Sequence, residues 1–321
     1  MSGDADTFTN SSGRNGQPIQ KLPGFIATPR ARWPRHVNVT PRIPAPPSDD
    51  RDVVITFIGH STFLLQSMQA TVLTDPMFSN RASPVSFAGP KRVHEPGVRL
   101  ADLPRIDMVL LSHNHYDHCD LPTLHELAQR FQPLVVTPSG NRDLVEKSGI
   151  TRVEQLGWWQ SSRKSPVPVT VAPAQHFSAR TPFDRNRALW GSFVFELAGR
   201  RLYFAGDTGY SEHFRVIRAR AGRMDLTLLP IGAYEPRWFM KDVHMNPAEA
   251  VQAHLDLESK HSVAMHFGTF QLTPEAIDAP PQALRHALDE RGVDRAVFDV
   301  PVPGESLHLS DVLRPRVVAH A

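Results

Sequence analysis

Short apolar segments recur along the chain from residue 53 onward, and polar or Gly- and Pro-containing stretches separate them. Runs of this length that are rich in Val, Ile, Leu and Phe are typical of buried β-strands. The pattern predicts strands at residues 53–59, 62–67, 70–75, 106–112, 133–138, 167–173, 192–197, 201–207, 226–232, 261–268 and 295–300.

Four segments between these runs carry apolar residues at helical spacing instead. They span residues 121–131, 213–222, 246–257 and 280–292. Asn246 stands directly before Pro247, which predicts a helix N-cap followed by a proline in the first turn. Many short strands with helices distributed among them indicate a layered α/β fold, in which helices cover two packed sheets around one core.

The first 50 residues lack this periodicity and are rich in Gly, Ser, Asn and Pro. We therefore predict an extended or partly disordered N-terminal arm over residues 1–50 and one folded domain over residues 51–321. Part of the arm is basic and has no acidic residue, and it also holds Phe25, Ile26 and Trp33. It either contacts anionic lipid head groups or wraps around the domain as a solvated arm. Its basic residues are Lys21, Arg30, Arg32, Arg35 and Arg42.

Composition limits the classes of protein that fit. A length of 321 residues with 40% hydrophobic content is enough for a substantial core. The formal net charge of +2 is too small to indicate a nucleic-acid-binding protein. The single cysteine, Cys119, excludes an intrachain disulfide framework, and a small buried side chain is the simpler interpretation than a reactive thiol. No uncharged apolar run approaches the roughly 18 residues of a membrane span, and the N-terminus lacks the apolar core of a signal peptide, so we expect a cytoplasmic chain.

The stretch "HNHYDH" follows the predicted strand at residues 106–112. In an extended segment His113 and His115 point to the same side, because side chains alternate with a period of two. The turn that follows directs Asp117 and His118 elsewhere. Imidazoles and carboxylates suit Zn, Fe or Mn, and without several thiolates a structural zinc site is not expected. The pattern favours an open catalytic metal site over a polar surface loop.

Three further candidate ligands each stand at the end of a predicted strand. His176, Asp207 and His266 all lie where a strand gives way to a loop, which is the usual place for ligands on a rigid scaffold. Each alone would more simply be a structural residue, but together they reinforce one another. Gly206 and Gly209 flank Asp207 and would allow the backbone to approach a bound ion.

The HxHxDH stretch, the later His, the "GD" Asp and the last His together resemble the metal signature of the metallo-β-lactamase superfamily. The resemblance implies an αββα sandwich, two mixed β-sheets flanked by helices, and two Zn²⁺ ions, with Fe or Mn as alternatives. It assigns His113, His115 and His176 to one metal, assigns Asp117, His118 and His266 to the other, and makes Asp207 the bridge between them.

Longer segments narrow the resemblance. The stretches "LTDPMFSNRASPVSFAGPKR", "LLSHNHYDHCDLPTL", "FAGDTGY", "PIGAYEPRWFMKDVHMNPAEAV" and "HFGTF" look like those of the N-acyl-phosphatidylethanolamine-hydrolysing phospholipase D family. This likeness runs from about residue 52 to residue 272. It implies a hydrolase in which a hydroxide between two metals attacks a phosphodiester and releases phosphatidic acid and an N-acylethanolamine. Two alternatives stay open, a soluble phosphodiesterase or sugar-phosphate lactonase of the same fold, and a metal-binding module without catalysis.

Several side chains near these motifs are candidates for catalysis or substrate binding. Asp117 and Asp207 are ligands or proton shuttles. His244 either reaches a phosphoryl oxygen, caps the helix start or supports a metal ligand from outside. Tyr116 lies within the histidine-rich stretch and is a candidate for substrate contact. Arg180 either binds phosphate or forms a structural ion pair.

Two more residues near the motifs have open roles. Arg237 is a candidate for phosphate binding, with an ion pair to Glu235 as the structural alternative. Asp75 either accepts a hydrogen bond from a metal-bound imidazole or stabilises a turn. Five aromatic residues line an acyl-chain groove or belong to the core: Phe78, Phe87, Trp158, Trp159 and Phe183.

The expected partners follow from this interpretation. The substrate is an N-acylated phospholipid, reached by peripheral contact with the inner face of a membrane. A homodimer stays open, and nucleic acid is not expected.

Overall fold

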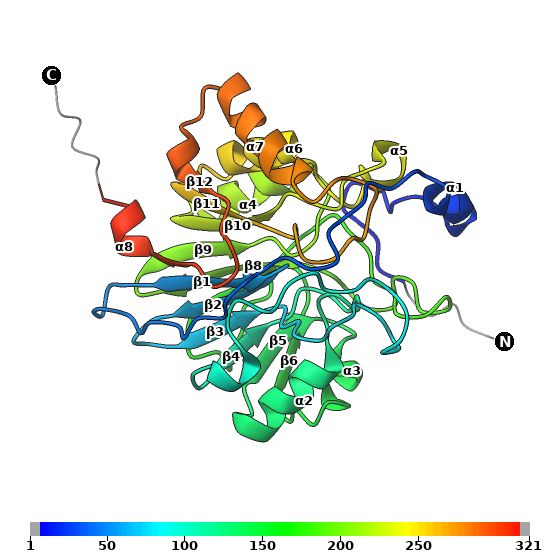
Figure 1. Cartoon of the computed structure of the whole chain (residues 1–321). Helices are drawn as coiled ribbons and strands as arrows, with labels where there is room; N and C mark the ends of the chain where they lie inside the picture. The colour runs from blue at the N-terminus through cyan, green and yellow to red at the C-terminus, as the bar shows by residue number, and fades with distance from the viewer. Residues whose placement is uncertain (1–6, 315–321) are drawn as a thin grey trace, which may run out of the picture.

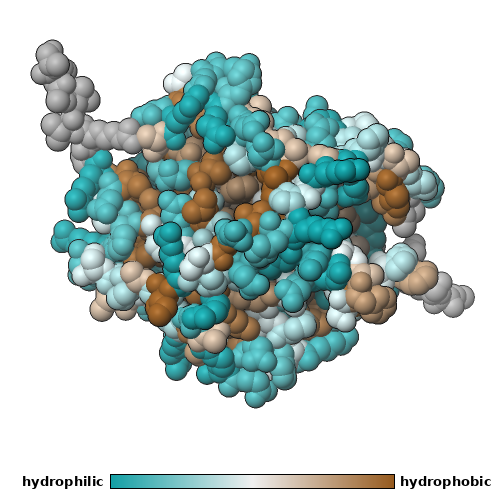
Figure 2. All heavy atoms as spheres, in the orientation of Figure 1, coloured by the Kyte–Doolittle hydropathy of each residue, from teal (hydrophilic) through white to brown (hydrophobic). Residues whose placement is uncertain are grey.

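The computed structural model describes residues 7–314, and it consists of two β-sheets packed face to face with helices on the outer face of each (Figure 1). This arrangement confirms the predicted αββα sandwich. Apolar side chains from the inner faces of both sheets form the main core, which includes Phe63, Phe193 and Phe204. Figure 2 shows that hydrophilic residues cover most of one face of the molecule, while hydrophobic residues reach this surface mainly along its middle.

The first sheet has seven strands in the order β13-β1-β2-β3-β4-β5-β6. The pairs from β13 to β3 are antiparallel, and the pairs from β3 to β6 are parallel. The strands are β1 (Val54–Gly59), β2 (Thr62–Gln66), β3 (Thr71–Thr74), β4 (Met108–Leu110), β5 (Leu134–Pro138), β6 (Val153–Leu156) and β13 (Ser306–His308).

The second sheet has six strands in the order β12-β11-β10-β9-β8-β7. The strand β8 pairs antiparallel with both β7 and β9. The pairs from β9 to β12 are parallel, so all strands of this sheet except β8 run in the same direction. The strands are β7 (Val169–Ala172), β8 (Ser192–Leu197), β9 (Arg200–Phe204), β10 (Leu226–Pro230), β11 (His261–Met265) and β12 (Phe298–Asp299).

The longer helices cover the outer faces of the sheets (Figure 1). Helices α2 (Leu121–Arg130) and α3 (Arg142–Glu146) lie against the first sheet, where a second apolar cluster forms. Helices α4 (His213–Ala221), α6 (Pro247–Asp256) and α7 (Ala279–Glu290) lie against the second sheet. Shorter helices are α1 (Leu22–Ile26), α5 (Arg237–Met240) and α8 (Leu309–Val312), with 3-10 turns at Ile19–Lys21, Leu100–Asp102 and Arg295–Val297.

The helix boundaries agree closely with the sequence pattern, whereas the ends of the first sheet do not. Asn246 is the N-cap of α6, as predicted, and its side chain also accepts a hydrogen bond from the Glu249 backbone in a capping box. The strands β6 and β13 were not predicted, because β6 contains polar Glu154 and Gln155 and β13 is only three residues long. The strand expected at 295–300 was wrong in its first half, which forms a 3-10 turn.

The topology brings the carboxyl ends of several strands to one edge of the sandwich. Strands β1, β3 and β4 of the first sheet run in the same direction, as do β7, β9 and β11 of the second. The loops that follow these strands therefore meet where the two sheets adjoin, and most of the candidate ligands lie on these loops.

Candidate metal centre

Seven histidines and two aspartates from separate loops gather at this edge, and we call them the histidine centre. Within the described residues they fall into groups whose ligand atoms lie within 4.8 Å of one another. All nine are buried except His115, which is partly exposed. The residues of the histidine centre are His60, His113, His115, Asp117, His118, His176, Asp207, His244 and His266.

The first group consists of His113, His115 and His176. The Nδ1 atom of His115 lies 2.9 Å from Nε2 of His113 and 3.2 Å from Nε2 of His176. Three nitrogens bound to one tetrahedral zinc ion, each at 2.0–2.1 Å, would lie about 3.3 Å apart. The group therefore has the spacing that a zinc ion needs.

The protonation of His176 supports the same conclusion. Its Nδ1 lies 2.8 Å from the carbonyl oxygen of Val243, and because a carbonyl only accepts, Nδ1 donates. The neutral ring then carries its lone pair on Nε2, which faces His115 Nδ1. This is the tautomer that a ligand to a metal requires.

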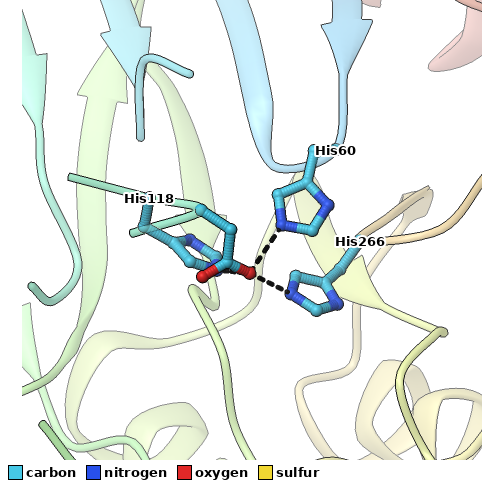
Figure 3. Close-up of side chains that lie close together, drawn as sticks. His60, His118 and His266 are labelled. Carbon is cyan, nitrogen blue, oxygen red and sulfur yellow. Dashed lines mark hydrogen bonds and ion pairs between the residues drawn. The ribbon is translucent and has the colours of Figure 1, made fainter. Parts of the chain in front are cut away.

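The second group consists of Asp117, His118 and His266, joined by His60. Oδ2 of Asp117 lies 2.9 Å from Nε2 of His60 and 3.4 Å from Nε2 of both His118 and His266. In Figure 3 the three imidazoles come from different segments and converge on this carboxylate. A carboxylate with two or three imidazoles is a donor set that suits zinc, iron or manganese.

Asp207 lies between the two groups. Its Oδ2 is 3.1 Å from Nε2 of His118 and of His266, and 3.9 Å from Nε2 of His113 and of His176. Buried polar atoms usually have a hydrogen-bond partner. Oδ1 of Asp207 and Nε2 of both His118 and His266 are buried without a well-aligned one. Unmatched lone pairs directed at one small volume fit divalent cations better than a closed hydrogen-bond network.

Burial and neighbouring charges separate the histidines into two kinds. Burial, with the neighbouring histidines, lowers the pKa of His115 to about 3, and burial lowers the pKa of His176 to about 4, so these rings are neutral. Burial also opposes charge on His266, but Asp207 and Asp117 outweigh it and raise its pKa to about 9. Without a cation the two carboxylates therefore draw a proton onto the second group, and a metal ion would replace that charge.

Asp75 supports one imidazole from each group. Its Oδ2 lies 2.6 Å from Nδ1 of His118, and its carboxylate also accepts hydrogen bonds from the backbone N–H and the Oγ of Ser112. Ser112 Oγ in turn lies 2.8 Å from Nδ1 of His113. Because ligating histidines commonly donate their second N–H to a carboxylate or hydroxyl, Asp75 has the contacts of an outer support for the centre, the first of its two predicted roles.

His244 also faces the centre. Its Nε2 is 3.9 Å from Oδ2 of Asp207, and its Nδ1 is buried without a hydrogen-bond partner. Since Asn246 caps α6, the alternative that His244 caps this helix is wrong. Burial lowers the pKa of His244, and the Nε2 atom of this neutral ring, next to the carboxylate between the groups, is able to contact a bound substrate.

Arg180 and Tyr116 contact each other beside the histidine-rich loop. The Arg180 guanidinium stacks 3.9 Å from the centre of the Tyr116 ring and donates to the carbonyl oxygens of Asn114 and Cys119. The Tyr116 hydroxyl donates to the Arg180 carbonyl oxygen. Arg180 therefore holds the loop in place through carbonyl oxygens rather than through the ion pair considered as its structural alternative. The thiol of Cys119 is buried, and burial raises its pKa to about 12, which fits an unreactive side chain.

Arg237 has a different partner from the one considered. Its Nη2 lies 2.7 Å from Oε2 of Glu249, and its Nη1 donates to the carbonyl oxygen of His244. Among the described contacts, Glu235 accepts a hydrogen bond from the Arg237 backbone N–H and none from its guanidinium, so the structural alternative of a side-chain pair with Glu235 is wrong. The guanidinium links the capping box of α6 to His244.

Sequence reasoning missed two residues of this region, His60 and Asn10. His60 follows the strand β1, so the pattern that singled out His176 and His266 could have found it. Asn10 lies in the N-terminal arm, and its amide contacts the backbone of His176. No local pattern could have indicated that contact.

Comparisons with known proteins agree with the fold and the site. Residues 70–267 match the family model described as a beta-lactamase superfamily domain. An uncharacterised protein of Mycobacterium tuberculosis is 40% identical over 292 residues, which cover 87% of this chain and 77% of that protein. N-acyl-phosphatidylethanolamine-hydrolyzing phospholipase D 1 of Caenorhabditis elegans is 38% identical over 248 residues, which cover 74% of this chain and 70% of that protein.

A solved structure adds to the same picture. Igni18, a metallo hydrolase from Ignicoccus hospitalis, superposes with a TM-score of 0.61 at 22% identity, over 80% of this chain and 98% of the other. The chain therefore belongs to the metallo-β-lactamase superfamily, in the family that includes the N-acyl-phosphatidylethanolamine-hydrolysing phospholipases D. Within residues 7–314 no helix has the length and apolar character that crossing a bilayer requires.

Proposed function

We propose that this protein is a dinuclear metal hydrolase that cleaves the phosphodiester of N-acyl-phosphatidylethanolamine to phosphatidic acid and an N-acylethanolamine. The observation that carries the proposal is the histidine centre, in which Asp207 lies between two groups of ligands, 3.1 Å from His118 of one and 3.9 Å from His113 of the other. The likeness to the worm phospholipase D supports the choice of substrate. The fold and the donor set support metal-dependent hydrolysis more generally.

The ligands divide between two cations, for which zinc is our first choice and iron or manganese the alternatives. His113, His115 and His176 would hold one ion, Asp117, His118 and His266 would hold the other, and Asp207 lies where it would serve both. When bound, two such ions supply an activated water and stabilise charge on the attacking and leaving oxygens.

The chain's own residues orient the substrate and manage protons around these ions. His244 contacts a phosphoryl oxygen through Nε2, because this atom faces Oδ2 of Asp207 at 3.9 Å. Asp117 and Asp207 fix the charge of the centre, and either can carry a proton at a carboxylate oxygen. Arg237 donates to the carbonyl oxygen of His244 and so positions that residue. Arg237 therefore contributes to the orientation of His244 rather than to phosphate binding.

A cleft next to the histidine-rich loop fits part of an anionic amphiphile. Its volume is about 700 Å³, and Tyr116 and Arg180 line it together with Arg81 and Lys147. Val85, Leu121 and Leu144 supply apolar surface, and polar side chains, among them that of Asp120, line the rest. Basic groups beside apolar surface match a phospholipid, whose phosphate is charged and whose chains are not.

Exposed apolar residues support peripheral contact with a membrane. On helix α1, Leu22 is 37% exposed and Ile26 is 65% exposed, and on helix α5 Trp238 is 49% exposed. The two helices touch, because Phe25 stacks on Phe239 at 4.8 Å between ring centres. Exposed Lys21 and Arg30 flank α1, and apolar residues between basic ones are typical of segments that rest on anionic lipid. Phe87 and Phe183, which lie on two loops, have exposed side chains as well.

The decisive experiment compares substrates with one purified protein. We expect about two zinc or iron ions per chain and faster cleavage of N-acyl-phosphatidylethanolamine in mixed micelles than of bis-p-nitrophenyl phosphate or a sugar-phosphate lactone. The double variant His113→Ala, His115→Ala should lose hydrolysis of every substrate and keep its circular dichroism spectrum. Faster turnover of the small substrates would favour a soluble phosphodiesterase or lactonase. Full activity of the double variant would refute metal-dependent hydrolysis altogether.

A further inference from the structure

Asn10, in the N-terminal arm, is buried with only 5% of its surface exposed. Its side-chain amide pairs with both backbone polar groups of His176: Nδ2 donates to the carbonyl oxygen at 2.8 Å, and Oδ1 accepts from the N–H at 3.1 Å. Oδ1 also accepts from the indole Nε1 of Trp190 at 2.9 Å. The two residues Asn10 and His176 are 166 positions apart in the sequence.

Asn10 supplies the hydrogen-bond partners that the backbone of His176 does not find in a neighbouring strand. His176 lies four residues beyond the end of β7, in a segment without regular structure, so no neighbouring strand pairs with its backbone. Buried N–H and C=O groups need partners, and Asn10 provides one for each. The ring is fixed separately, because its Nδ1 donates to the carbonyl oxygen of Val243. Backbone and ring support together decide where the Nε2 atom of His176 points.

The arm around Asn10 also contacts the connection between β7 and β8, which carries His176, and the loop before α6, which carries Val243. The backbone N–H of Phe8 donates to the carbonyl oxygen of Asn186, and Arg185 donates to the carbonyl oxygen of Asn15. Arg14 lies 3.7 Å from Asp242, one residue before Val243.

The same stretch of the arm packs closely on the loop that holds the His176 ring. Gly16 has a φ of +74°, and a Cβ atom there would come within 2.8 Å of a methyl group of Val243. The arm therefore contacts the loop whose carbonyl group orients the His176 ring.

We propose that Asn10 is a positioning residue of the metal centre and that residues 8–16 of the arm complete the support of His176. The segment sets the affinity of the group His113, His115 and His176 for its ion. The second group has no contact with Asn10 among those described, so its ion depends on the arm much less. This role extends beyond the proposed reaction and does not depend on which substrate is cleaved.

The test measures zinc affinity at both sites by competition with a chromophoric chelator, in the full-length protein. The variants are Asn10→Ala, which removes the amide, and Asn10→Asp, which keeps the shape but sets a carboxylate oxygen against the His176 carbonyl group. The matched control is Asn38→Ala, because Asn38 is an exposed asparagine of the same arm. Loss of an outer support of a metal ligand commonly weakens binding by about 10- to 100-fold.

We expect that weakening for one of the two ions in both Asn10 variants, no change for the other ion, and wild-type values for the control. The visible spectrum of the cobalt-substituted protein should also change, since the geometry around one ion changes even when the site is saturated. Folded Asn10 variants with wild-type affinity at both sites would overturn the proposal. Equal weakening at both sites, or variants that stay unfolded in saturating zinc, would overturn it too, because Asn10 would then serve the fold. None of these measurements needs a substrate, so they are independent of the proposed lipid specificity.

Discussion

The contacts of Asp75 lead to a quantitative prediction for the variant Asp75→Asn. In the native protein the carboxylate accepts from the Ser112 backbone at 2.7 Å, from Ser112 Oγ at 2.5 Å and from His118 Nδ1 at 2.6 Å. An asparagine of the same size has only one acceptor oxygen. If its NH₂ faces His118, two donors meet, and His118 must move its proton to Nε2, the atom that would bind a metal.

If the amide is turned the other way, its NH₂ meets the backbone N–H of Ser112 instead. In either orientation one buried donor loses its acceptor, which costs about 1–3 kcal/mol of stability. Ser112 also loses the anionic partner through which it supports His113. Removing such a support should weaken metal binding by about 10- to 100-fold, which equals about 1.4–2.7 kcal/mol. Because Asp75 supports His118 directly and His113 through Ser112, both ions should be affected.

A matched control separates this effect from general destabilisation. Asp120 is also buried, and its carboxylate accepts from Ser79 and Thr123, but it has no hydrogen bond to a histidine among the described contacts. Asp120→Asn should lower the melting temperature of the chelator-treated protein about as much as Asp75→Asn does, yet keep both zinc affinities. Competition with a chelator and thermal melts with and without EDTA measure the two quantities. Wild-type zinc affinity in Asp75→Asn would refute the role assigned to Asp75.

Two further predictions concern His60 and the membrane surface. His60→Ala should lower the affinity only for the ion of the Asp117 group, because His60 Nε2 lies 2.9 Å from Asp117 Oδ2. Zinc titration followed by elemental analysis measures which ion is lost. Loss of the other ion first would contradict this prediction. The triple variant Leu22→Ser, Ile26→Ser, Trp238→Ser should cosediment less with anionic phospholipid vesicles than the wild type while hydrolysing bis-p-nitrophenyl phosphate equally well. Unchanged recovery with the vesicles would remove these residues from the proposed membrane contact.

The local spacing of apolar residues was sufficient to predict most of the helices and strands. Helix α6 shows why: its apolar spacing, Asn246 and Pro247 all act within a few residues, so the sequence alone specifies where it begins. The strand β13 shows the limit. It has three residues and exists because Ser306, Leu307 and His308 pair with β1, about 250 positions earlier. The stability of such an edge strand comes from its partner, and no local signal announces it.

For the candidate ligands, too, some features follow from the local sequence and others only from tertiary contacts. The chain order of "HNHYDH", and a His or Asp directly after each of several strands, indicated the residue types and the scaffold that carries them. The sequence also pointed to Asp75, although it left two roles open. It could not assign the partners of Arg237, because Glu235 and Glu249 are both near it in the sequence and only the tertiary structure brings Glu249 within 2.7 Å of its guanidinium.

The sequence by itself therefore indicated most of the candidate metal ligands and that strand ends would carry them, because alternation and helical spacing are local properties of the chain. The tertiary structure alone decided that His60 joins Asp117, that Asp207 lies between the two groups, and that the arm reaches His176 through Asn10. These contacts join segments separated by 57 to 166 residues, or by the gap between two sheets. Their geometry depends on how the sheets pack and where the loops meet, which no short stretch of sequence encodes.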